Sequence, residues 1–186
     1  DPKRVKEARK NAQKAGVAGK VVFLEKNIYE TDFSRATVIA MYLFPNINLK
    51  LRPKFLENLE PGTRIVSHDF GMDEWKPDKK HGRMDEHAVL LWIVPAKVEG
   101  EWSWKTAGKD FRMSVNQNFQ EITPTIRLDQ KTPLKVENSL LSGKRISFSA
   151  SDKANKRKFV FSGHVENGEI KGIVQIHDGK NQSLEP

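Results

Sequence analysis

The sequence predicts an α/β domain followed by an all-β domain, and two observations lead to this fold class. In the first half, apolar runs without polar alternation flank a stretch of helical spacing, which is typical of a parallel sheet buried on both faces. From about residue 97 onward, apolar and polar residues alternate, and turn signals such as LSGK and ENG recur roughly every ten residues. We therefore expect an α/β domain over residues 1–95 and an antiparallel β-domain, a small barrel or sandwich, over residues 96–186.

The α/β domain begins with a helix-start signal, DPKRVKEARKNAQKAG. Asp1 suits the N-cap, Pro2 suits the first helical position, and Gly16 suits a left-handed ending. A helix of this kind normally follows another element, and neither a methionine nor a leader precedes it. We therefore expect the natural protein to contain further residues before Asp1.

Three apolar segments, residues 21–25, 37–44 and 63–69, are expected to form parallel strands. A helix should connect the second segment to the third, with Pro53 at the start of its main stretch. Two more strands, one around Trp75 and one in HAVLLWIVPA, should close the sheet as an antiparallel hairpin.

Several aromatic residues lie in the β-domain, and two interpretations of them remain open. Side chains at alternating positions of a small barrel usually form its core, but they can also line a ligand cavity. The residues are Trp102, Trp104, Phe111, Phe119, Phe148, Phe159 and Phe161. We expect no catalytic residue in this domain, which we interpret as a docking or structural unit.

The composition excludes several kinds of protein. The 186 residues contain no cysteine, which excludes a disulfide framework, a thiolate nucleophile and a Cys-ligated zinc site. The longest apolar runs, VIAMYLF and VLLWIVPA, are strand-sized, so no helical membrane span is expected. The lack of cysteine fits a reducing compartment, and we expect a cytoplasmic protein. An exported form stays open until the start of the natural protein is known.

The chain is basic, with 32 Lys and Arg against 24 Asp and Glu and a formal net charge of +8. This charge favours an anionic partner, but it is spread along the chain. The basic side chains of the first helix surround most of its circumference, and no aromatic residues interleave with them to stack on bases. A solvated helix face is therefore favoured over a nucleic-acid contact, and the basic clusters at 76–83 and 153–158 are expected to be exposed hairpin tips.

Residues 1 to about 95 resemble the later two-thirds of a class I S-adenosylmethionine-dependent methyltransferase. The resemblance rests on the opening helix, on VVFLEKNIYETDFSRATVIAMYLFPNINLKLRPKFLENLEPGTRIVSHDF and on WKPD. In that family a Gly-rich loop and an acidic residue after the second strand bind the cofactor, and an Asp-Pro pair commonly opens the next helix, as Asp1-Pro2 does here. The resemblance therefore implies a partial Rossmann-like sheet lacking its first strands and S-adenosyl-L-methionine as cofactor. It also implies that this chain alone binds the cofactor weakly and is inactive.

The resemblance further implies positions for a site. Asn27 and Ile28 stand where the family binds the adenine of its cofactor, although Asn27 suits a simple turn as well. The motif MYLFPN departs from the Asn-Pro-Pro-Tyr pattern of enzymes that methylate nucleic-acid bases, and it is closer to small bacterial lysine methyltransferases. Tyr42 is the catalytic candidate, orienting the acceptor, with a buried core aromatic as the alternative. The candidates for lining the acceptor pocket are Pro45, Asn46, His68 and Asp69.

Two other chemistries are disfavoured. Ser67, His68 and Asp69 suggest a hydrolase triad, but neighbours on a strand point to opposite faces and cannot form the relay. The remaining histidines show no ligand spacing, so no metal site is expected.

Two functions of different classes remain. We favour a methyltransferase that acts on an unidentified acceptor, for example a protein amine, with nucleic acid disfavoured. The alternative is a non-catalytic binding module whose basic β-domain recognises an anionic partner. A sheet without its first strands has exposed edges, which predicts pairing with another segment or a homo-oligomer through these edges.

Overall fold

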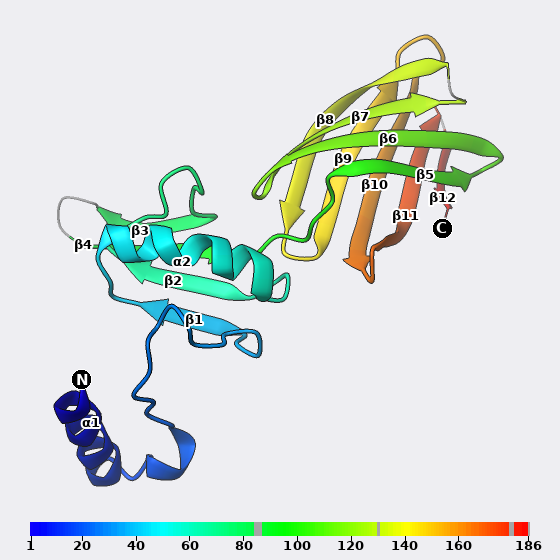
Figure 1. The fold of residues 1–186 in the computed structure, drawn as a ribbon. Helices are drawn as coiled ribbons and strands as arrows, with labels where there is room; N and C mark the ends of the chain where they lie inside the picture. Colours follow the sequence, from blue (N-terminus) through cyan, green and yellow to red (C-terminus); the bar gives the residue numbers. More distant parts are fainter. Residues whose placement is uncertain (84–86, 130, 179–180, 186) are drawn as a thin grey trace. The chain divides into compact units, whose positions relative to one another are not determined.

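The computed structural model describes residues 1–83, 87–129 and 131–178, and the backbone of residues 181–185. The chain divides into two compact units, Asp1–Phe33 and Ser34–Pro186, and we describe each by itself. The α-helices and strands of both units are labelled in Figure 1. None of the helices in the described residues is long and apolar enough to cross a membrane.

The first unit is a helix followed by an irregular segment. In α1 (Pro2–Lys14), Asp1 is the N-cap, and its Oδ1 accepts the N–H of Lys3 at 2.9 Å. The chain turns away at Gly16 with a φ of 67°, a conformation that is sterically costly for other residues. A single 3₁₀ turn, η1 (Ala18–Lys20), follows. The predicted helix from Asp1 to Gly16 is confirmed.

The predicted strand at residues 21–25 is wrong for this chain. The segment is irregular, and its apolar residues Val21, Val22 and Leu24 are 39%, 82% and 56% exposed. A strand forms only where a neighbour takes up its N–H and C=O groups. In the described part of the chain, no strand pairs with this segment.

Four strands and one helix form the α/β part of the second unit. They are β1 (Val38–Met41), α2 (Pro45–Asn58), β2 (Arg64–His68), β3 (Lys79–Arg83) and β4 (His87–Ile93). The strand order is β1-β2-β4-β3. β1 and β2 are parallel, whereas β4 is antiparallel to both of its neighbours. The predicted parallel pairing of residues 37–44 with 63–69 is confirmed, and so is the closing antiparallel hairpin.

The start of α2 differs from the prediction. The helix begins at Pro45 and not at Pro53, because an extended Phe44 at the N-cap and a proline at the first helical position already start it. Pro53 lies inside the helix, where it removes one hydrogen-bond donor from the helical ladder.

The first strand of the closing hairpin also differs from the prediction. It is Lys79–Arg83 and not a segment around Trp75, because Trp75 is fully buried and only bridges back to Met72. The basic cluster at 76–83, expected to be a hairpin tip, is therefore mostly an exposed edge strand.

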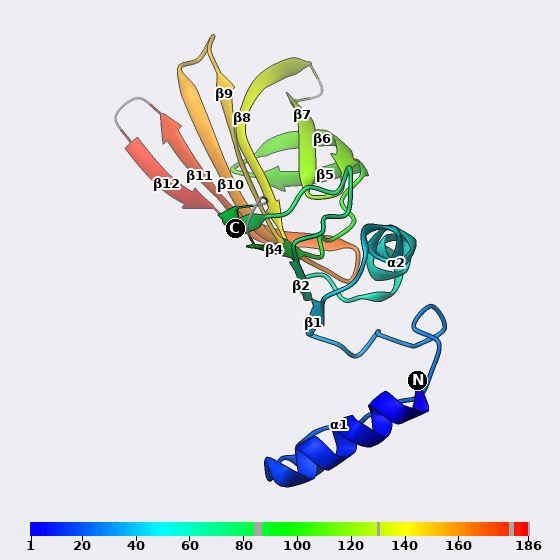
Figure 2. The same ribbon diagram turned by 90° about the vertical axis from the view of Figure 1, so that its left-hand side faces the viewer.

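The second unit continues with eight strands in one antiparallel meander. They are β5 (Gly100–Thr106), β6 (Lys109–Asn118), β7 (Glu121–Leu128), β8 (Thr132–Ser142), β9 (Arg145–Asp152), β10 (Arg157–Glu166), β11 (Glu169–Asp178) and β12 (Asn181–Glu185). A bulge between Glu137 and Leu140 shifts the register of β8. The sheet curls strongly (Figure 2), so that Phe111 on β6 meets Phe159 on β10 with ring centroids 5.3 Å apart. The antiparallel β-domain expected from about residue 97 onward is confirmed as a barrel-like sheet.

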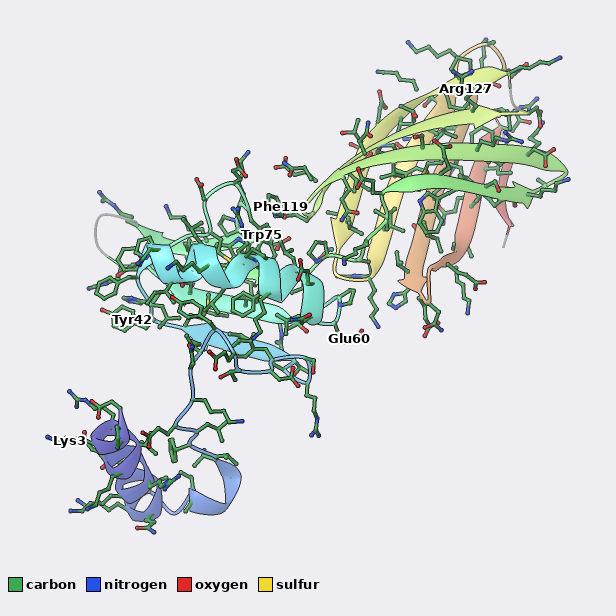
Figure 3. All side chains as sticks on the ribbon, viewed as in Figure 1. Lys3, Tyr42, Glu60, Trp75, Phe119 and Arg127 are labelled. Carbon is green, nitrogen blue, oxygen red and sulfur yellow. The ribbon has the colours of Figure 1, made fainter. Side chains whose placement is uncertain are left out.

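The α/β part and the barrel-like sheet meet at Trp75. Its ring stacks on Phe119 in the β6–β7 turn, with centroids 5.9 Å apart (Figure 3). Its Nε1 donates to Gln120 Oε1 at 2.9 Å, and Gln120 Nε2 donates to the carbonyl of Lys76 at 2.7 Å. Phe119 therefore belongs to this junction, and the interpretation that it lines a cavity of the β-domain is wrong.

Candidate functional site

The candidate site lies at the carboxyl ends of the parallel strands β1 and β2, where open α/β sheets place their ligands. Tyr42 follows β1, and His68 and Asp69 end and follow β2. The structure brings these three residues together. Pro45 and Asn46 lie in the first turn of α2, where both are exposed.

Tyr42 is a surface residue of this edge. It is 75% exposed, and the edge of its ring meets the ring of His68, with centroids 4.8 Å apart and an interplanar angle of 87°. The alternative that Tyr42 is a buried core aromatic is therefore wrong. An exposed phenol can donate or accept a hydrogen bond from a ligand.

Asp69 has an unusual backbone conformation that explains how it reaches its neighbours. Its φ is 61°, so the alternation of side chains along β2 ends at this residue. Its N–H donates to the carbonyl of Ala88, and its Oδ1 accepts the N–H of Ala88, each at 2.8 Å. The Ala88 hydrogen bond lowers the pKa of the Asp69 carboxyl, and His87 and His68 lower it further. The second oxygen of this carboxylate is directed to the two histidines.

His87 completes a cluster that sequence reasoning missed. Its Nδ1 lies 3.2 Å from Asp69 Oδ2, and its ring centroid lies 5.1 Å from that of His68. The ligand atoms of His68, Asp69 and His87 all lie within 4.8 Å of one another, a proximity that the spacing of the histidines in the sequence did not predict. The signal was the antiparallel hairpin, because pairing β4 against β2 brings the start of β4 to the carboxyl end of β2.

Asn48 is a second residue that sequence reasoning missed. It is fully buried on α2, and its Nδ2 donates to Ser67 Oγ at 3.2 Å and to the carbonyl of Phe70 at 3.1 Å. These bonds fix the chain on both sides of the His68–Asp69 pair. Asn48 therefore holds the residues of the candidate site in position from the buried side of the sheet, and it does not contribute to the surface of the site.

The expected cofactor residues lie in the first unit. Asn27 is exposed and holds a turn, in which its Oδ1 accepts the N–H of Tyr29 at 3.1 Å and its Nδ2 donates to Glu30 at 2.8 Å. An amide oxygen has two lone pairs, so Oδ1 can still accept one more hydrogen bond. Ile28 beside it is half-buried.

The aromatic residues of the barrel-like sheet fit both interpretations. Phe111, Phe148, Phe159 and Phe161 are buried in its core. Phe148 and Phe161 also line a cavity of about 440 Å³, together with Trp102 and Trp104. The wall of this cavity is mainly apolar, and the polar side chains that line it come from β5, β10 and β11.

Comparisons with known proteins find similarity to methyltransferases. Residues 1–79 match the family model described as the ANTKMT methyltransferase domain. The chain is 40% identical over 95 residues to a protein-lysine N-methyltransferase of Saccharolobus islandicus, a match that covers 49% of this chain and 58% of the relative.

A solved structure gives the same result. The chain is 47% identical to an RNA methyltransferase from Salinibacter ruber in complex with S-adenosyl-L-homocysteine, with a TM-score of 0.51. The match covers 53% of this chain and 63% of that chain. The chain thus spans less than two thirds of the length of these relatives. Together with the order of a parallel β1-β2 pair closed by an antiparallel hairpin, these matches show that residues 1–79 are similar to a methyltransferase domain.

Proposed function

We propose that the protein transfers a methyl group from S-adenosyl-L-methionine to an amine of a protein. The observation that carries the proposal is the match of residues 1–79 to a methyltransferase domain, strengthened by 40% identity to a protein-lysine N-methyltransferase. In this proposal residues 1–95 are the methyltransferase portion, and residues 96–186 are a docking domain without catalytic residues.

Asn27 and Ile28 are the proposed cofactor contacts. The remaining lone pair of Asn27 Oδ1 suits the amino group of an adenine, and the side chain of Ile28 suits the face of the ring. The residues present therefore fit a nucleoside ligand. When bound, S-adenosyl-L-methionine supplies an electrophilic methyl group on its sulfonium, so that catalysis is mainly alignment and desolvation of the acceptor.

The acceptor site is proposed at the carboxyl edge of β1 and β2. Tyr42 orients the acceptor nitrogen through its exposed hydroxyl. The residues proposed to line the pocket are Pro45, Asn46, His68 and Asp69. Because the His68 ring supports the Tyr42 ring, the phenol has a defined direction, which alignment of an acceptor requires.

A protein amine is proposed over a nucleic-acid base because of the strand end MYLFPN. The segment offers an aromatic hydroxyl and apolar groups, and it lacks the Asn-Pro-Pro-Tyr pattern of base-methylating enzymes. The Salinibacter ruber relative is an RNA methyltransferase, so RNA is the rival acceptor that an experiment has to include. β1 is the outer strand of its sheet, which supports the expectation that another segment or a second copy pairs with it.

The proposal is tested by measuring transfer of a radiolabelled methyl group from S-adenosyl-L-methionine to lysine-rich protein and to RNA. The assay is run on the 186-residue chain, for which we expect little transfer, and on any longer form of the gene product. With the longer form we expect label in the protein fraction, and Tyr42→Phe should reduce its kcat roughly tenfold or more through loss of acceptor alignment.

Thr37→Val is the control, because it also removes an exposed hydroxyl but precedes β1, at the opposite end of this strand from Tyr42. Its kcat should stay within about twofold of the unchanged protein. Label in RNA alone would contradict the acceptor class, and equal losses in both variants would contradict the role of Tyr42.

A further inference from the structure

We propose that His68, Asp69 and His87 form a binding site for a divalent transition-metal ion of the Zn²⁺ type. The site rests on the geometry of this cluster and is independent of the methyl transfer proposed above. Two imidazoles and one carboxylate are ligands that Zn²⁺ and its first-row neighbours prefer, and three protein ligands leave a coordination position open.

The distances around Asp69 Oδ2 fit a coordination polyhedron. This oxygen lies 3.1 Å from His68 Nδ1 and 3.2 Å from His87 Nδ1. With metal–ligand bonds of about 2.1 Å, neighbouring ligand atoms lie about 3.0 Å apart in an octahedron and about 3.4 Å apart in a tetrahedron. Both distances lie between these values.

The orientation of His68 favours a metal ion over a shared proton. A proton bridging two atoms lies near the line that joins them, whereas a metal ion lies off that line, where the lone pairs converge. His68 Nδ1 is only 3.1 Å from the carboxylate, yet it is buried and makes no aligned hydrogen bond within the described residues. A buried polar atom in this state calls for an explanation, and an ion is one of the few available.

The positions of Asp69 and His87 also suit the binding of a cation. Asp69 Oδ1 is occupied by the Ala88 N–H, so the carboxylate is held in place and Oδ2 is left for the ion. The side chain of His87 is 77% exposed, so its ring can rotate. This freedom matters because the ligand atoms lie within 4.8 Å of one another, and two ligands of one ion cannot exceed about 4.2 Å.

The location of the metal site determines which groups can reach the ion. It lies at the strand edge where the acceptor pocket is proposed, and the Tyr42 ring touches one of its ligands. An ion there offers its open position to a group with a lone pair, such as a water molecule or an amine.

The test is calorimetric titration of Zn²⁺ into the full 186-residue chain after dialysis against a chelator, with S-adenosyl-L-methionine absent. Co²⁺ is titrated in parallel, because its visible absorption reports nitrogen and oxygen ligation. We expect one ion per chain with micromolar affinity. His87→Ala should weaken binding roughly tenfold or more, and because His87 is exposed, this variant should keep its fold.

His164→Ala is the matched control, since His164 is an exposed histidine on β10 away from the cluster, and its affinity should match that of the unchanged chain. Asp69→Asn gives a second variant, because an amide oxygen still accepts the Ala88 N–H but offers no carboxylate; it should also weaken binding. Binding that is weaker than millimolar, or equally strong in His87→Ala, would overturn the proposal. Either result leaves the methyl-transfer proposal untouched, because no methyl donor is used.

Discussion

At the scale of single residues, Asn48 links the core of the α/β part to the candidate site. Its buried Nδ2 holds Ser67 Oγ and the carbonyl of Phe70. Asn48→Ala leaves buried acceptors without a donor, and we expect the free energy of unfolding to fall by about 1–3 kcal/mol. Asn46→Ala, on the exposed first turn of the same helix, should change it by about 0.5 kcal/mol at most. Urea titrations followed by tryptophan fluorescence give both values, and equal effects would contradict the positioning role of Asn48.

At the scale of elements, the β9–β10 hairpin depends on an ionised turn residue. Asp152 Oδ2 accepts Asn155 Nδ2 at 2.7 Å, and this bond is the largest cause of the lowered pKa of Asp152. The unfolded chain therefore binds a proton at a higher pH than the folded chain does, so the stabilisation is present above the unfolded pKa and is lost as the pH falls through the folded pKa.

A variant of Asp152 separates the stabilisation by its carboxylate from the other causes of pH-dependent stability. Asp152→Asn should lower the free energy of unfolding by about 1 kcal/mol at pH 7, and the difference from the unchanged chain should shrink toward zero at acid pH. Unfolding by urea at both pH values measures the difference. A difference that stays constant with pH would mean that the charge of Asp152 does not stabilise the turn.

The helices and strands also show which parts of the fold and of the candidate site the sequence could predict. Local signals identified α1, because Asp1, Pro2 and Gly16 act within the helix itself. Hydrophobic patterns identified the parallel β1–β2 pair and the meander. The strand at 21–25 was wrong because a strand depends on partners that no local pattern reveals. The His87 contact was missed because the residue lies 18 positions from Asp69 and is brought there by the pairing of β4 with β2.

At the scale of the whole molecule, the two units should differ in stability. α1 has 13 residues and buries only Ala12, whereas β6, β9 and β10 carry much of the second unit's core. A helix of this length with so little packing is marginal in water, so its amides should open at a free energy near zero.

We expect hydrogen exchange on the 186-residue chain to show α1 exchanging fast, while β9 and β10 exchange only through global unfolding. All four tryptophans lie in the second unit. The change of tryptophan fluorescence during urea unfolding therefore measures the global unfolding of this unit directly. Amides of α1 that are protected as strongly as those of β9 would show that the first unit is held by the second, and the division at Phe33 would be wrong.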